Sequence, residues 1–173
     1  MFWEKGYEAA SVPDLLKAMG LSRSSLYETF ADKETLYKEA LRHYKTIGQA
    51  KRKLLVNPPS AKAGIRLYFE RHIAFAFDEE LPKGCLVTNA AVGVNTPDEL
   101  LRQLVRDSFE ELEQLFYELL RKGQQAGEID AGKDIRTLAL LLLNLNHSIN
   151  VLSRVKTDKQ IFYDMMDTVI DML

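Results

Sequence analysis

The chain has 173 residues, 46% of them hydrophobic and 28% charged, with a formal net charge of −2. This balance is ordinary for a globular protein and excludes a disordered or fibrous chain. The longest aliphatic run, residues 138–143, is far shorter than the roughly 20 residues of a membrane-spanning helix, and the start lacks the pattern of a secretory signal. With Cys85 as its single cysteine, the chain is expected to be cytoplasmic, without a membrane partner or an internal disulfide.

Apolar residues recur at three- and four-residue spacing along almost the whole chain, which predicts an all-α fold. Ser11 is a typical N-cap for a first short helix ending at Met19, and Ser22 for a second one, with a turn at Gly20 between them. Asp32 opens a longer helix over residues 33–56, which ends before two consecutive prolines. We expect the domain boundary inside this helix, with domains at 1–45 and 46–173.

The second half is predicted to hold five more helices. An aromatic-rich helix follows Ser60 to about residue 78, and a short one covers 85–94. The sequence Thr96-Pro97-Asp98-Glu99 has the form of a capping box with Thr96 as the N-cap, and it opens a five-turn amphipathic helix ending near Gly123. The last two helices are expected at about 133–154 and 158–173.

The two short helices carry the clearest motif. Residues 12–38 read VPDLLKAMGLSRSSLYETFADKETLYK, and this segment resembles the DNA-binding part of the tetracycline-repressor (TetR) family of bacterial regulators. The resemblance implies a three-helix helix-turn-helix domain followed by a helical ligand-binding and dimerisation domain. From the residues alone, Gly20 permits a sharp turn, and the start of the second helix is crowded with hydrogen-bonding groups suited to a major groove.

The resemblance implies that double-stranded operator DNA is the partner of this motif. Phosphate contacts are expected from Ser11, Ser22, Ser24, Tyr27 and Lys33, and contacts to base edges from Arg23, Ser25, Glu28 and Thr29. Lys33 follows the cap Asp32, where the helix dipole disfavours a cation, so a bound phosphate would explain it; the alternative is a solvated lysine. Leu16 and Ser24 depart from the small residue and the glycine common at these family positions, which puts the inter-helix angle and groove contacts in doubt.

Charge gives weaker support. Residues 1–53 carry 10 Lys/Arg and 7 Asp/Glu, and the rest of the chain carries 13 and 18. A mildly basic first part suits a phosphate-bearing partner, although an imbalance of this size also arises by chance.

For the remainder, the resemblance implies a ligand pocket between the middle helices and a homodimer through the last two. Aromatic residues with a few polar ones are the pocket candidates for an unidentified small-molecule effector: Phe69, His72, Phe75, Cys85, Asn89, Phe109, Phe116, Asn144 and His147. Each of these alone is also a normal packing residue. The expected dimer contacts are Leu141, Leu145, Ile149, Leu152, Phe162, Met165, Met166 and Val169.

The sequence also bears on two other classes of function. A di-iron enzyme needs Glu-x-x-His pairs, but the residues three before His43, His72 and His147 are Ala40, Phe69 and Asn144. No glycine-rich phosphate loop or HExxH motif is present, so we expect a protein that is not an enzyme and has no cofactor or metal. A helical adaptor that binds only proteins is the alternative to a repressor released from its operator by a ligand.

The chain begins within what the resemblance marks as the end of the family's first helix. We therefore expect the natural protein to start about 15 to 20 residues upstream, the length of a family helix. Without that helix, one face of Leu15, Met19, Leu26 and Phe30 is expected to meet water.

Overall fold

The structure is a computed structural model that describes residues 1–93 and 98–173. Within these ranges the chain forms nine α-helices and one 3-10 turn and no strand, which confirms the all-α prediction. In chain order the elements are α1 (Phe2–Ala9), α2 (Val12–Met19), α3 (Arg23–Phe30), α4 (Lys33–Arg52), η1 (Lys53–Leu55), α5 (Ala61–Ala76), α6 (Leu86–Val92), α7 (Glu99–Gln125), α8 (Ile135–Leu152) and α9 (Gln160–Asp171).

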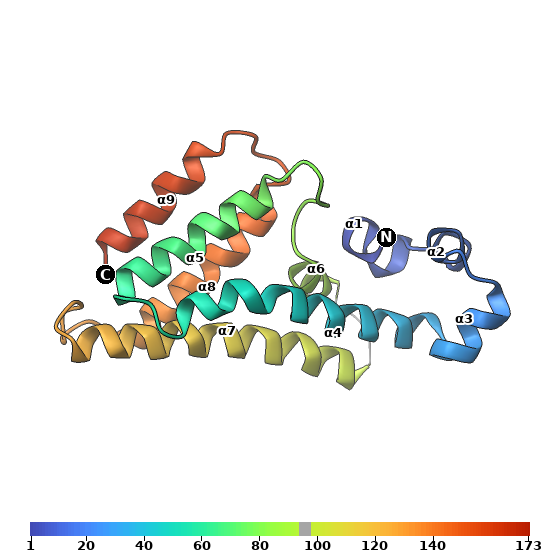
Figure 1. Cartoon of the computed structure of the whole chain (residues 1–173), viewed down its shortest axis with the longest axis horizontal. Helices are drawn as coiled ribbons and strands as arrows, with labels where there is room; N and C mark the ends of the chain where they lie inside the picture. Colours follow the sequence, from blue (N-terminus) through green and yellow to red (C-terminus); the bar gives the residue numbers. More distant parts are fainter. Residues whose placement is uncertain (94–97) are drawn as a thin grey trace.

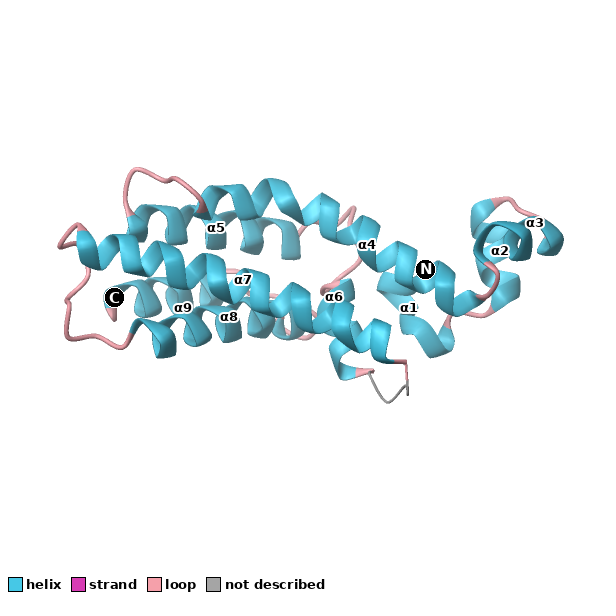
Figure 2. Ribbon diagram, turned by 90° about the horizontal axis from the view of Figure 1, so that it is seen from below, coloured by secondary structure: helices cyan, strands magenta, loops and turns pink. Residues whose placement is uncertain are grey.

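The long helices α4 and α7 run side by side along the molecule (Figures 1 and 2). Helices α5, α8 and α9 pack together at one end, and α1, α2 and α3 lie at the other. We use the name head for residues 1–45 and body for residues 46–173. Because α4 belongs to both, it joins them without a flexible linker.

Local side chains set the starts of the early helices. Ser11 and Ser22 each accept a hydrogen bond from a backbone N–H three residues later, and Asp32 and Ser60 do the same for α4 and α5. Gly20 ends α2 with φ of 66°, a left-handed conformation that favours glycine. The predicted helix-turn-helix boundaries are therefore confirmed.

The start of α7 differs from the prediction. Its N-cap is Asp98, whose carboxylate accepts the N–H of Leu101 at 2.8 Å. Thr96, the predicted cap, and Pro97 lie outside the described residues. An Asp at the cap position satisfies the same free N–H groups as a Thr, so the capping-box pattern placed the helix start two residues early.

Two clusters of buried side chains hold the described structure together. The body core gathers α5, α7, α8 and α9 around Phe69, Phe116 and Phe162, each 0% exposed. At Gly123, near the end of α7, a Cβ would lie 2.8 Å from the Cβ of Ala61, so glycine permits the close approach of α7 to the start of α5.

The second cluster joins the head to α6 and α7. Leu15 and Leu26 are 3% and 0% exposed, in one cluster with Phe2 and Ala10. The expectation that this face of the leucines meets water is therefore wrong for them, because Phe2 of α1 and Ala10, the residue after that helix, share their core. Met19, by contrast, is 36% exposed, and Phe30 is half-buried.

Helix α8 is long and apolar enough to cross a membrane by length and composition, although 39% of it is buried inside this fold. Its buried side includes Asn146 and Asn150, both with hydrogen-bond partners. A core helix of a soluble protein passes the same test.

Candidate functional site

The start of α3 is an exposed, hydrogen-bonded corner of the head. The Ser22 hydroxyl accepts the N–H of Ser25 at 3.1 Å and lies 2.9 Å from Ser24 Oγ and 2.8 Å from Ser25 Oγ. This cluster of hydroxyls fixes the first turn of α3. The N-terminal end of the helix therefore projects into solvent with its polar groups already ordered, as a groove-entering helix requires.

All nine side chains predicted to contact DNA lie on the head, and Ser25 and Lys33 alone among them are partly buried. On α3, the guanidinium of Arg23 lies 5.7 Å from the centroid of the Tyr27 ring, which is 38% exposed. Thr29 donates its hydroxyl to the carbonyl of Ser25 at 2.8 Å. The remaining residues of the set are exposed: Ser11 and Ser22 are the N-caps of α2 and α3, and Ser24 and Glu28 lie within α3.

Lys33 is held by the head's own aromatic core. Its ammonium lies 4.4 Å from the centroid of the Tyr7 ring in α1, a cation–π contact. The cap Asp32 accepts the N–H of Thr35 at 2.7 Å and so satisfies one of the free N–H groups of α4. The ammonium is thus positioned by α1 at the start of α4, the positive end of the helix dipole, which favours an anion.

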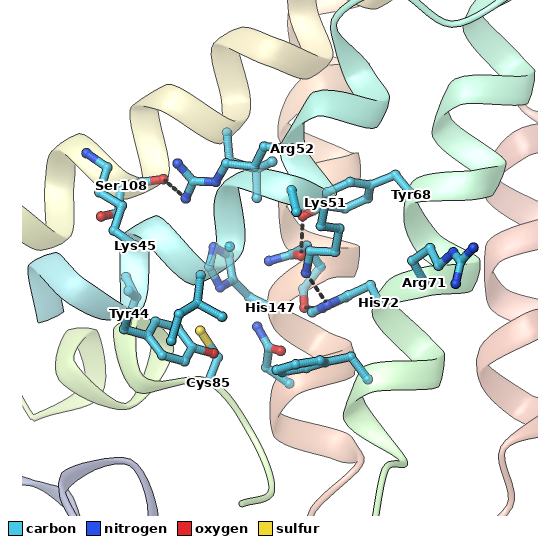
Figure 3. Close-up of a pocket in the computed structure, with 18 of the residues that line it drawn as sticks. Tyr44, Lys45, Lys51, Arg52, Tyr68, Arg71, His72, Cys85, Ser108 and His147 are labelled. Atoms are coloured by element: carbon cyan, nitrogen blue, oxygen red, sulfur yellow. Dashed lines mark hydrogen bonds between the residues drawn. The ribbon is translucent and has the colours of Figure 1, made fainter. Parts of the chain in front are cut away.

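The body contains a cavity of about 550 Å³ between α4, α5, α6, α7 and α8 (Figure 3). Of the predicted pocket residues, five line it: His72, Phe75, Cys85, Phe109 and His147. Several polar residues of the cavity wall were not predicted from the sequence. The main ones are Tyr44, Lys51, Arg52, Tyr68, Ser108, Asn146 and Asn150. Tyr44 and Lys51 are seven residues apart and therefore share a face of α4. This spacing is visible in the sequence and could have indicated that both face the same site.

The other predicted pocket residues lie elsewhere. Phe69 and Phe116 stack on each other at 5.8 Å in the body core, where both are fully buried. Asn89 donates to the carbonyl of Trp3 and accepts from Arg154. Asn144 is exposed on the outward side of α8. Helical spacing cannot separate a core-facing aromatic from one that faces a cavity, because both lie on the apolar side of a helix.

One wall of the cavity is a buried polar network centred on His72. Its Nε2 lies 3.1 Å from the backbone carbonyl of Asn146, and the Tyr68 hydroxyl donates to the side-chain oxygen of Asn146 at 2.9 Å. Burial, followed by the charge of Lys51, holds the pKa of His72 well below its usual 6.5. His72 is therefore neutral at pH 7.

The opposite wall holds a second neutral histidine. Burial lowers the pKa of His147 to about 4. Its ring stacks on Phe109 at 4.0 Å, and its Nδ1 lies 2.9 Å from the hydroxyl of Thr88. Its buried Nε2 has no hydrogen-bond partner within the described residues. The cavity wall therefore combines aromatic rings with polar side chains that are held by hydrogen bonds inside the fold.

The head touches the wall of this cavity directly. The ring of Trp3 in α1 packs 4.9 Å from that of Tyr44 and 5.8 Å from that of Phe75, and both of these residues line the cavity. Trp3 also donates its Nε1–H to the carbonyl of Gly84 at 3.1 Å, directly before the cavity residue Cys85. A change in the shape of the cavity therefore bears on α1 through aromatic contacts.

An outward groove of about 620 Å³ lies between α8 and α9. Leu141, Leu145, Met165 and Val169 line it, as members of the predicted dimer surface. Other residues predicted for that surface are placed differently: Ile149, Phe162 and Met166 are 0%, 0% and 2% exposed in the core of the same chain, and Leu152 packs against that core. They turn inward because the apolar sides of α8 and α9 are wide enough to serve two faces.

Comparison with known proteins agrees with this geometry. The family model for bacterial regulatory proteins of the tetR family matches residues 1–40, and the tetracyclin repressor-like C-terminal domain model matches residues 61–169. The chain is 32% identical to the uncharacterized HTH-type transcriptional regulator YezE of Bacillus subtilis, over 100% of this chain and 90% of YezE. It is 26% identical to the HTH-type transcriptional repressor ComR of Escherichia coli, over 89% of this chain and 74% of ComR.

Among solved structures, a cysteine mutant of the TetR family transcriptional regulator CifR, in complex with a 26-bp double-strand operator DNA, superposes with a TM-score of 0.88. The two sequences are 31% identical, and the match covers 98% of this chain and 90% of CifR. The chain therefore belongs to the TetR family and is a DNA-binding transcriptional regulator.

Proposed function

We propose that this regulator is a repressor that binds double-stranded operator DNA as a homodimer and releases it when a small molecule occupies the cavity of the body. The related ComR of Escherichia coli is named a repressor, and CifR has been solved on its operator. Such a protein acts in the cytoplasm and catalyses no reaction of its own.

For DNA binding, the proposal assigns contacts to the exposed N-terminal half of α3 and to Lys33. The ordered hydroxyls around Ser22 suit phosphate oxygens, and Arg23 suits a guanine edge. Lys33 lies at the start of α4, where the helix dipole favours an anion, so it suits a second phosphate.

The single observation that carries ligand release is the contact of Trp3 with Tyr44 and Phe75. A ligand that prefers one shape of the cavity can bias the position of α1 only if cavity and head share packed residues. These three rings provide that connection. Helix α4 also runs from the head past the cavity. Two routes, one through the rings on α1 and one along α4, therefore connect the cavity to the head that carries α3.

The proposal is tested first on DNA. The purified chain is used to select binding sites from a random double-stranded library, and affinity for the selected site is compared with affinity for scrambled DNA by fluorescence anisotropy. A preference well above scrambled DNA, weakened by Arg23→Ala by about 1–3 kcal/mol, supports a sequence-specific regulator. Equal affinity for both DNAs contradicts it and favours the adaptor.

Release is tested next, with a library of small molecules screened for an increase in melting temperature. Molecules that stabilise the chain are expected to weaken binding to the selected site, and to lose both effects in Ala50→Trp, which fills the cavity wall. In a bacterial reporter strain, the chain is expected to lower expression from a promoter containing the site. A rise in expression indicates an activator and contradicts the repressor assignment.

A further inference from the structure

The charged side chains on the cavity wall are unevenly matched. Among the described residues that line it, Lys45, Lys51, Arg52 and Arg71 are cationic, and Asp78 is the single acidic residue. Two of these cations share one carboxylate outside the cavity, because Glu111 of α7 pairs with Lys45 at 2.5 Å and with Arg52 at 2.9 Å. Arg71 is exposed to solvent.

Lys51 has no such partner. Within the described part of the chain, no carboxylate lies within ion-pair distance of its ammonium. The ammonium faces the Tyr68 ring at 5.0 Å from its centroid and lies 2.6 Å from His72 Nδ1 (Figure 3).

The tautomer of His72 fixes the direction of that hydrogen bond. A backbone carbonyl only accepts, so the contact of His72 Nε2 with the carbonyl of Asn146 requires the proton on Nε2. His72 Nδ1 then carries the lone pair and accepts from Lys51. One N–H of the ammonium is satisfied by a neutral ring, and its positive charge is not balanced by any described side chain.

A partly buried cation without a counter-charge is costly, and a bound anion removes that cost. We propose that the effector is an amphipathic anion, with a carboxylate or similar head group on the ammonium of Lys51 and an apolar body against Phe75, Phe109 and Leu112. The cavity of about 550 Å³ has room for both parts. The proposal rests on the proposed function of the cavity as an effector site.

Burial lowers the pKa of Lys51 to about 8, so the ammonium is the main form at pH 7. His147 lines the same cavity, and its ring is stacked on Phe109, where the apolar body would begin.

The test uses two fluorescent probes with the same ring system, anionic anilinonaphthalene sulfonate and uncharged N-phenylnaphthylamine, on the full chain. Both are expected to bind and to compete with each other, and both should be lost in Ala50→Trp. Lys51→Met is expected to weaken binding of the sulfonate by about tenfold or more while changing that of the neutral probe by less than about twofold. The matched control is Lys45→Met, which removes a cation of the same wall that is paired with Glu111, and it should leave both affinities near the wild-type values.

The outcomes separate the two proposals. If neither probe binds the folded wild-type chain, the cavity does not admit such molecules, and the effector site itself is refuted. If both probes bind but Lys51→Met weakens both equally or neither, the effector site stands and the anionic head group is refuted. An equal loss for Lys45→Met also refutes it, because the effect would then come from the net charge of the wall. Circular dichroism melts confirm that each variant is folded.

Discussion

Lys51 combines two demands on one side chain. Its side chain lines the cavity, and its ammonium lies 5.0 Å from the centroid of the Tyr68 ring. Burial that helps the side chain to pack makes its charge unfavourable in the absence of a ligand. The ligand-free protein is therefore expected to lose stability at this site. The loss should be visible in how its free energy of unfolding depends on pH.

The first prediction concerns this pH dependence. The pKa of Lys51 is about 8 in the fold, against 10.5 as its ordinary value. Between these pH values the unfolded chain holds more protons than the folded one, so the contribution of Lys51 to stability falls as the pH decreases from 10.5 to 8 and stays reduced below that. In Lys51→Met this contribution is absent.

Urea unfolding of the wild type and of Lys51→Met, between about pH 8 and about pH 10, is expected to show this pH dependence. The free energy of unfolding of the wild type should gain roughly 1 kcal/mol per pH unit relative to Lys51→Met. Burial raises the pKa of Tyr44 and Tyr68 in the fold, so in this range they lose protons only in the unfolded chain, in both proteins alike, and cancel in the difference. Parallel profiles would show that the ammonium is fully solvated, which contradicts the environment described above.

At the scale of residues, the sequence showed which side chains have the chemistry of a pocket wall better than it showed which of them face the cavity. His72, Phe75 and Phe109 were predicted as pocket residues and line the cavity, but Phe69 and Phe116, of the same chemical type, stack in the core. The difference depends on which helices meet, which is a property of tertiary packing. Lys51 was missed because a lysine near the end of an amphipathic helix is normally solvated, and only the approach of α5 with His72 buries it.

At the scale of elements, local side chains determined most helix boundaries in the head. Ser11, Gly20 and Ser22 act within a few residues of themselves, and so their effects are readable without tertiary structure. The contact of α1 with α6 and the body was not predicted. It joins residues far apart in the chain, such as Trp3 and Gly84, through ring packing and one long-range hydrogen bond that no local pattern encodes.

The second prediction concerns this contact. In Trp3→Leu, the factor by which a stabilising molecule from the screen weakens operator binding is expected to fall by severalfold, because the packing that links cavity and head is reduced. Affinity of the molecule for the DNA-free protein, and affinity of the molecule-free protein for DNA, should each change less. Trp3→Phe retains a ring against Tyr44 and Phe75 and loses the Nε1–H donor, so it should lie between the two proteins.

Operator titrations by anisotropy, with and without the molecule, give the four affinities of the cycle for each variant. An unchanged ratio in Trp3→Leu would show that coupling runs along α4 alone. Loss of operator binding without any ligand would show that Trp3 supports the fold of the head, and thermal melts of the variant identify that case.

At the scale of the whole molecule, the proposed binding to an operator with two half-sites needs a second copy of the chain. Two α3 helices, one from each copy and held at a fixed separation, would then read the two half-sites. The groove between α8 and α9 is the apolar surface that suits this role. Its lining includes Leu141 and Met165, both half-buried in the single chain, together with the 40% exposed Ile161. The sequence predicted α8 and α9 for the interface, but its residue set combined inward and outward rows, since residues such as Phe162 and Met165 are neighbours along one stripe.

The last prediction is that the chain is a homodimer through this groove. Met165→Glu should place a charge in a desolvated apolar contact and produce a monomer, because an unpaired buried carboxylate costs several kcal/mol. The matched control is Leu100→Glu, at a 48% exposed leucine near the start of α7 and outside the groove, which should remain dimeric. Multi-angle light scattering at micromolar concentration distinguishes the two masses.

Because each monomer keeps its own core around Phe162 and Ile149, Met165→Glu is expected to stay folded and to retain probe binding in the cavity, while its operator affinity falls sharply. A wild-type chain that remains monomeric as its concentration is raised would contradict the assignment, since an obligate interface of this kind persists far below micromolar concentrations.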